Sequence, residues 1–160
     1  MPNMQNKSGN ISPLKAMTLV HRAMMLGQVI FAAIATVLVS TRAFYPSLQD
    51  QERIFQVVAL VLCFVGVYIG STLFRKRISS IRDSNASVNE RVDEYKKAAV
   101  VQWALLEGPV LFVIISFMLT ANYSLLVLAV VLMMVFAAMA PSKAKIVFLL
   151  RLNDNEAADV

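Results

Sequence analysis

The fold is decided by residues 98–120, AAVVQWALLEGPVLFVIISFMLT, a run of 23 residues in which Glu107 is the single charged side chain. An α-helix of about 20 predominantly apolar residues crosses the roughly 30 Å hydrocarbon core of a bilayer. The run is therefore long enough for a transmembrane helix, even a tilted one. We expect it to cross the membrane once and to carry one carboxyl group into the bilayer.

Three further apolar runs accompany it in a chain of 160 residues that is 58% hydrophobic. The sequence predicts an all-α integral membrane protein, a single membrane domain over residues 1–160 with little chain left for a soluble domain. The predicted transmembrane helices cover residues of about 17–41, 54–74, 98–120 and 124–140. Basic residues precede the first run, as in a signal peptide, but the run exceeds the about 7–15 apolar residues of such a peptide, so we expect it to be retained.

Basic residues are distributed unevenly over the connections between these helices. Of the 15 Lys and Arg residues, only Arg42 and Arg53 lie between the first two apolar runs, and the other 13 lie in the N-terminal segment, the 75–97 loop and the 141–160 tail. Cytoplasmic connections are enriched in Lys and Arg. We therefore predict a cell (inner) membrane protein with both termini and the 75–97 loop in the cytoplasm. Topology and attraction to anionic lipid at that face, rather than nucleic-acid binding, explain the net charge of +5.

The cytoplasmic 75–97 loop contains a signal for the start of a helix. Ser87 and Glu90 have the spacing of a capping box, in which the hydroxyl accepts from a first-turn amide and the carboxylate bonds back to the cap residue. A helical extension from about residue 88 should therefore continue into the third span. In the cytoplasmic tail, Pro141 ends the fourth span, and the apolar segment 146–152 is too short to cross, so we expect it at the inner interface or against the bundle.

The third apolar run is similar to the first. Residues 23–35, AMMLGQVIFAAIA, align without a gap with residues 104–116, ALLEGPVLFVIIS, at an offset of 81. Gly27 and Gly108 are among the identical pairs, and glycine in an apolar helix permits close approach of a second helix. The second and fourth runs align more loosely. We therefore predict two similar helical hairpins in a pseudo-symmetric bundle, related by an axis near the membrane normal.

The two copies differ most at Glu107 and Pro109. Glu107 is the tenth residue of the run of 23, which places it near the bilayer midplane. An ionised carboxylate there costs about 2.5–3.5 kcal/mol on insertion scales, so the side chain should face the bundle interior or be protonated. Pro109 has no amide hydrogen, so the carbonyl of Leu105 loses its helical partner and a kink is expected. The carboxyl group and this freed backbone form the predicted site.

Candidate partners of Glu107 follow from depth in the membrane. Gln28 in the first span should lie within about two residues' rise of Glu107, and Tyr68 in the second span lies slightly toward the cytoplasm. Both are predicted to be neutral hydrogen-bond partners of the carboxyl group. A second group lies about one helical turn away on the cytoplasmic side, and its members are Arg22, His21 and Trp103. Trp103 would either shield the carboxyl group from lipid or simply pack.

Catalytic and metal-binding chemistry is not indicated. The chain has one Cys, Cys63, and one His, His21, which is too few for a Cys- or His-based metal site or for a Ser-His-Asp relay. A Gly-rich phosphate loop and a pair of carboxylates within one span are also missing from the sequence. We therefore predict no catalytic residue, no metal ligand and no cofactor, and an enzyme is disfavoured.

The stretch Ala104–Asn122, ALLEGPVLFVIISFMLTAN, resembles the carboxylate-bearing helix of the rotary-ATPase proteolipid, or c, subunits. In that family a mid-membrane acid carries the ion, and the resemblance implies that role for Glu107. The chain departs from those subunits in having only 5 Gly residues and a Gly-Pro pair after the acid. In architecture the whole chain resembles small, uncharacterised four-helix membrane proteins of bacteria, a likeness that implies no function.

These observations favour a multi-pass membrane protein that acts as a structural or accessory subunit through helix–helix contacts, in a homo-oligomer or with other membrane subunits. In this interpretation a protonated Glu107 ties helices together. Two alternatives stay open. One is a proton- or cation-coupled transporter, or a channel-like subunit, that uses Glu107. The other is a bundle that binds a lipid or a small molecule.

Overall fold

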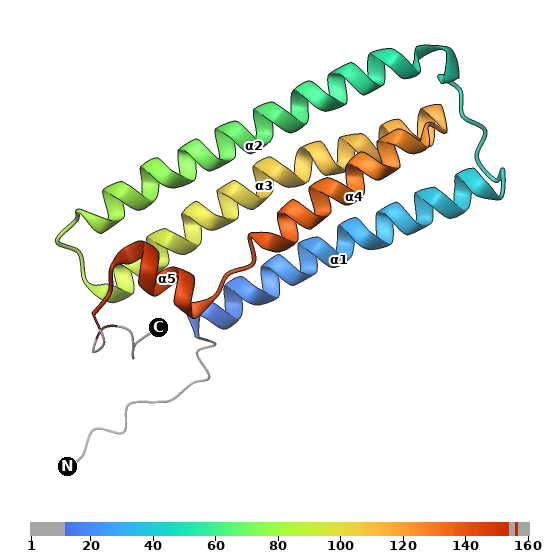
Figure 1. Cartoon of the computed structure of the whole chain (residues 1–160). Coiled ribbons are helices and arrows are strands. Elements are labelled where there is room, and N and C mark those ends of the chain that lie inside the picture. Colours follow the sequence, from blue (N-terminus) through green and yellow to red (C-terminus); the bar gives the residue numbers. More distant parts are fainter. Residues whose placement is uncertain (1–11, 154–155, 157–160) are drawn as a thin grey trace.

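The computed structural model describes residues 12–153 and residue 156. These residues form five α-helices and one short 3-10 helix, and no strand occurs among them (Figure 1). In chain order the elements are α1 (Pro13–Ser40), η1 (Gln49–Gln51), α2 (Glu52–Arg82), α3 (Val88–Thr120), α4 (Tyr123–Ala138) and α5 (Lys143–Leu150). The prediction of an all-α chain is therefore confirmed.

Three of these helical units are long and apolar enough to cross a membrane. They are α1, α2 together with η1, and α3. The fourth predicted span, residues 124–140, corresponds to α4, whose 16 residues are too few to count as a span alone. The axis of α4 is bent by 69° from that of α5. If the bent pair counts as one span, the chain has up to four candidate transmembrane helices.

The helix α3 lies at the centre of the bundle. It packs against α1, α2 and α4, and α1 and α2 lie on its two outer sides (Figure 1). The helices α3 and α4 form a close hairpin across a turn in which Ala121 is left-handed, with φ 54°. In contrast, α1 and α2 have at most marginal contact with each other. The two halves of the chain therefore pack differently, and the pseudo-symmetric pair of hairpins stays a prediction.

The bundle has two ends, and α2 extends further toward one of them than the sequence predicted. The basal end holds Ser12, the 83–87 connection and α5, whereas the distal end holds residues 41–51 and the 121–122 turn (Figure 1). The expected 75–97 loop is wrong in its first part, because residues 75–82 continue α2 as helix. The reason is that Ile78 and Ile81 lie on one face, each 6% exposed, and are buried in the basal core.

The capping box at the start of α3 is confirmed. The backbone N–H of Ser87 donates to Glu90 Oε2 at 3.0 Å, and the Ser87 hydroxyl accepts from the Glu90 amide. The Ser87 hydroxyl also donates to Glu90 Oε2 at 2.9 Å. Because hydrogen bonds to the carboxylate favour its ionised form, the Ser87 amide and then its hydroxyl hold the pKa of Glu90 below its ordinary value. From this cap α3 runs as one helix through Pro109 to Thr120.

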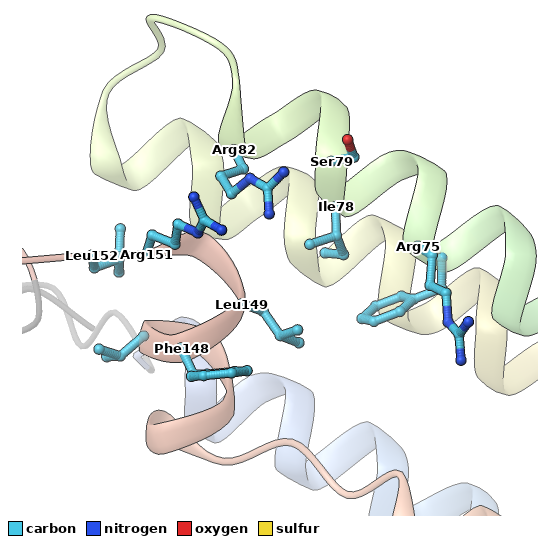
Figure 2. Close-up of a pocket in the computed structure, with 10 residues that line it drawn as sticks. Arg75, Ile78, Ser79, Arg82, Phe148, Leu149, Arg151 and Leu152 are labelled. Carbon is cyan, nitrogen blue, oxygen red and sulfur yellow. The ribbon is translucent and has the colours of Figure 1, made fainter.

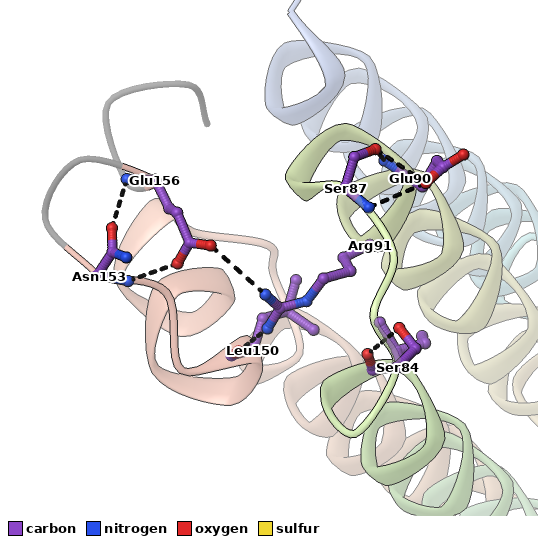
Figure 3. A network of polar contacts seen from close by, with 8 residues as sticks. Ser84, Ser87, Glu90, Arg91, Leu150, Asn153 and Glu156 are labelled. Carbon is purple, nitrogen blue, oxygen red and sulfur yellow. Dashed lines mark hydrogen bonds and ion pairs between the residues drawn. The ribbon is translucent and has the colours of Figure 1, made fainter.

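The segment after α4 folds back on the basal end. Ile146 and Leu150 of α5 are fully buried, so the 146–152 segment packs against the bundle, one of its two expected positions. Arg91 of α3 donates to the carbonyl of Leu150 and lies 3.8 Å from Glu156, as Figure 3 shows. Asn153 and Glu156 exchange hydrogen bonds of 2.9 and 2.8 Å. The extension of α3 thus fixes the end of α5.

Candidate intramembrane site

The predicted site lies where α2 meets α3. A Cβ atom added to Gly66 of α2 would lie 2.8 Å from the carbonyl oxygen of Leu105 and 2.8 Å from Pro109 Cγ. These distances leave no room for a side chain, so the two helices approach closely at this point. One turn further along α2, a Cβ atom added to Gly70 would lie 3.6 Å from the backbone oxygen of Gln102, which is an ordinary van der Waals contact. The carbonyl that Pro109 frees therefore lies against the backbone of α2.

Close approach occurs at glycines other than those of the internal repeat. A Cβ atom added to Gly27 or Gly108 would have nothing within 4 Å, and both residues are exposed. The expectation that these two glycines admit a neighbouring helix of the same chain is therefore wrong. The sequence did carry the correct signal, since Gly66 and Gly70 form the G-x-x-x-G pattern GVYIG in the second apolar run.

Glu107 lies on an outward face of α3 instead of inside the bundle. Its side chain is half-buried, and it has no hydrogen bond or ion pair within residues 12–153 and 156. Its carboxylate oxygens are not among the polar atoms that the bundle seals off. Ala104 and Gly108, the small residues beside it, are exposed. The carboxyl group is therefore open to whatever surrounds the bundle.

Gln28 shows the opposite environment. It is 1% exposed, and both its Nε2 and its Oε1 are buried without a hydrogen-bond partner among the described residues. The predicted bond between Gln28 and Glu107 is therefore wrong. The rotation of α1 turns Gln28 into the bundle, where it shares a face with His21, Ala32 and Ala35.

Tyr68 is not a partner of Glu107 within the chain either. It is 73% exposed and points away from the bundle, because Gly66 and Gly70 on either side of it are the residues of α2 that face α3. A tyrosine in a membrane-length helix thus presents its hydroxyl group outward. The predicted intrachain bond to Glu107 is wrong.

The three residues expected around the site separate from it. His21 is 3% exposed, its Nε2 lies 3.0 Å from the carbonyl oxygen of Phe136, and its ring is stacked on that of Phe136. Trp103 is 1% exposed and meets His21 edge to face at 4.9 Å, so it packs in the core rather than covering Glu107. Arg22 is exposed. His21, Trp103 and Phe136 form a separate buried cluster that joins α1, α3 and α4.

The structure shows no group of side chains that could bind a metal ion in the described residues. In the part of the chain that the structure describes, no three His, Cys, Asp or Glu side chains lie close enough to hold a metal ion. Cys63 is buried and free. The polar chemistry of the apolar region is thus carried by separate groups.

A scan against protein-family models found no match, and searches of curated proteins and of solved structures found none either. The resemblance to proteolipid subunits around Glu107 therefore stays a prediction, and function has to be argued from the geometry alone.

Proposed function

We propose that the protein is a multi-pass subunit of the cell (inner) membrane that assembles with copies of itself, with both termini in the cytoplasm. Its role is structural or accessory and is exerted through helix–helix contacts. The polar contact between copies is a hydrogen bond between Glu107 of one copy and Tyr68 of the next. The observation that carries the proposal is that both groups face outward and have no partner in the described part of their own chain.

The two groups lie at the same depth. Gly66 touches the carbonyl oxygen of Leu105 and the ring of Pro109, so its depth lies between those of these two residues. Tyr68 is two residues from Gly66, and Glu107 stands midway between Leu105 and Pro109. At a rise of about 1.5 Å per residue, the depths of Tyr68 and Glu107 therefore differ by about 3 Å. Copies that lie side by side in one bilayer can bring the two side chains together.

The chemistry of the pair is complementary. A tyrosine hydroxyl donates one hydrogen bond, and a carboxyl group accepts it in either protonation state. Within hydrocarbon, water is not available as a substitute partner, so each group gains from finding the other. Measured bonds between polar side chains of membrane helices are worth about 0.6–2 kcal/mol, enough to bias association.

The surroundings of Glu107 admit a second helix. Ala104 and Gly108 are exposed and four residues apart, so they lie on one face of α3 with Glu107 beside them. Small residues at this spacing let helix backbones approach closely. Because the contact joins different surfaces of two copies, it is heterologous, and repeating it closes a ring or extends a chain of subunits.

Cysteine cross-linking tests this contact directly. In a Cys63→Ala background, the Glu107→Cys and Tyr68→Cys variants are made separately, and membranes holding one variant or both are oxidised. The proposal expects a cross-linked dimer when both variants are present together, and little when either is alone. A Gly108→Leu change should abolish the cross-link. The matched change Gly27→Leu, at the residue of α1 that aligns with Gly108, should leave the cross-link intact.

Two outcomes would overturn the proposal. One is a chain that stays monomeric in mild detergent and in membranes, with no cross-link from the mixed variants. The other is cross-linking of each variant with itself at the same rate as with the other, because that result indicates random collision rather than a defined contact.

Proton or cation transport is the second candidate, and the unpaired, accessible carboxyl group of Glu107 favours it. Liposomes with the parent chain and with Glu107→Gln should then differ in proton or cation flux while the two chains have equal thermal stability. Loss of flux with unchanged assembly would favour transport. Loss of assembly with no flux in either sample would favour the subunit role.

A further inference from the structure

A hollow of about 530 Å³ opens at the basal end between α2 and α5. One wall comes from the last two turns of α2 and the other from the end of α5 and the residues after it, as Figure 2 shows. Its lining is unusual in composition, because three arginines, Arg75, Arg82 and Arg151, stand among apolar side chains and no acidic side chain takes part. The hollow thus combines positive charge with an apolar wall.

The arginines of the hollow are largely available to a ligand. Arg82 donates through Nε to Asp83 at 3.3 Å, which leaves both terminal nitrogens of its guanidinium group without a partner in the described residues. Arg75 and Arg151 form no ion pair within that part of the chain. Figure 2 shows Arg82, the last residue of α2, and Arg151, the residue after α5, at the same end of the hollow, with Arg75 at the other end. Guanidinium groups that line the two walls of one hollow carry like charges, and an anion between them would offset their repulsion.

A neighbouring hollow shows what neutralised cations look like in this molecule. It has about 270 Å³, and Arg77 and Lys97 contribute to its lining. Both cations are paired there, since Arg77 binds Glu94 at 2.6 Å and Lys97 lies 2.8 Å from Glu94 and 3.2 Å from Asp93. Among residues 12–153 and 156, the arginines of the larger hollow have no comparable set of acidic partners. The unpaired positive charge is therefore a property of the larger hollow and not of the whole basal end.

The hollow lies where α2 leaves the apolar layer. The apolar part of α2 covers residues 54–74, and its middle is taken as the bilayer midplane. Phe74 is ten residues from that middle, which is about 15 Å at a rise of about 1.5 Å per residue. Phe74 therefore lies at the edge of the hydrocarbon core. Arg75 lies just beyond that edge, and Arg82 follows about 12 Å past Phe74. The long side chain of Arg82 can reach back to the headgroup layer from its aqueous side. Phe148 of α5 is 80% exposed, an arrangement typical of an aromatic side chain at the membrane interface.

We propose that this hollow binds one anionic phospholipid. The phosphodiester lies between Arg82 and Arg151, each of which can donate two parallel hydrogen bonds to its oxygens. The upper part of an acyl chain lies along Ile78 and Leu149. A soluble phosphate would satisfy the arginines but would leave this apolar wall uncovered, so the combination of charges and wall selects a lipid. The proposal is independent of the contact between copies described above.

The test measures lipid binding to the full chain purified in detergent. Native mass spectrometry counts the phosphatidylglycerol or phosphatidylcholine molecules that remain bound, and thermal unfolding is followed as each lipid or inorganic phosphate is added. We expect one retained phosphatidylglycerol and a saturable rise in unfolding temperature with that lipid alone. The double variant Arg82→Gln/Arg151→Gln should bind it at least about tenfold more weakly, since the loss of even one charge-assisted hydrogen bond costs about that factor.

The matched control is the double variant Arg77→Gln/Lys97→Gln, which removes the same amount of charge from the neighbouring hollow. It should retain the bound phosphatidylglycerol. Arg82 and Arg151 are surface side chains, so we expect the double variant to unfold at the parent's temperature in the absence of lipid. That result would exclude misfolding as the cause of weaker binding. The single change Arg75→Gln provides a milder second variant. Three results would overturn the proposal: equal retention of phosphatidylcholine, equal protection by phosphate, or equal loss of lipid from the control variant.

Discussion

The helices α1 and α3 contain stretches of similar sequence, residues 23–35 and 104–116, and these stretches have different surroundings in the fold. In α3, Pro109 packs on Gly66 of α2, and Glu107 stands open on the outer surface. In α1, the residue that aligns with Pro109 is Gln28, which is sealed in the bundle without a hydrogen-bond partner in the described part of the chain. Both similar stretches therefore form helices, but their polar residues lie in different environments.

The difference arises from position in the bundle. The apolar stretch of α3 is 44% buried because three helices surround it, whereas that of α1 is 22% buried. A central helix meets neighbours on several faces, so a Gly-Pro pair can be matched by a glycine across the interface. A peripheral helix keeps one buried stripe, and a polar residue on that stripe has few side chains within reach.

The largest expected effect comes from filling the contact that makes α3 central. Gly66→Leu places a side chain where even Cβ would be 2.8 Å from Leu105 and Pro109, so the helices must separate. We expect a loss of at least about 1–3 kcal/mol in the free energy of unfolding. Thermal unfolding in detergent, followed by the fluorescence of Trp103, the single tryptophan and 1% exposed, measures it.

Two controls make this test specific to the crossing of α2 and α3. Gly27→Leu adds the same side chain on α1, where nothing lies within 4 Å, and should leave the unfolding temperature unchanged or slightly raised. Gly70→Ala meets only ordinary contacts at 3.6 Å and should be tolerated. If Gly66→Leu and Gly27→Leu behaved alike, the crossing of α2 and α3 at Gly66 would not be a tight contact.

A smaller effect, opposite in sign, is expected at the aligned position of α1. Gln28→Leu keeps the approximate volume of the side chain and removes two buried polar atoms that have no partner. We expect the free energy of unfolding to rise by about 1–2 kcal/mol. The same fluorescence measurement applies, with Gln28→Asn as a control that keeps the amide and should give no gain. A loss of stability in Gln28→Leu would mean that the Gln28 amide forms a stabilising hydrogen bond in the folded protein.

The sequence predicted the helices better than the contacts between them. Apolar length located the membrane-length helices, and the spacing of Ser87 and Glu90 located the start of α3, because both depend on residues close together in the chain. The failed expectations concerned pairs far apart in sequence. Whether Gln28 meets Glu107 depends on the rotation of α1 about its axis, which hydrophobic pattern leaves loosely defined in helices that are apolar all round.

The site could be found in part. Glu107 was identifiable because a charge in an apolar run is costly, but its outward orientation follows from which face of α3 the other helices cover. The G-x-x-x-G pattern at Gly66 and Gly70 would have identified the tight interface, although it could not have named Pro109 as the opposite surface. The basal hollow was beyond prediction, since it depends on α5 folding back beside Arg82.

The smallest expected effect concerns the part of α3 that α1 lacks, its extension before residue 98. There Glu94 binds Lys97 on its own helix and Arg77 of α2, and these two bonds hold the pKa of Glu94 below its ordinary value near 4.5. A lowered pKa in the folded state stabilises that state above the ordinary pKa, and the contribution disappears as the pH falls through the folded-state pKa. The parent should therefore unfold at a slightly higher temperature than Glu94→Gln near neutral pH. This difference should close as the pH falls below 4.5 and through the lower, folded-state pKa of Glu94. Asp93→Asn, which removes only an ion pair within α3, should give a smaller difference in unfolding temperature.

A temperature difference that persisted unchanged into acid would show that Glu94 acts through packing and not through its charge. The contact between α2 and α3 at the basal end would then depend on apolar packing alone.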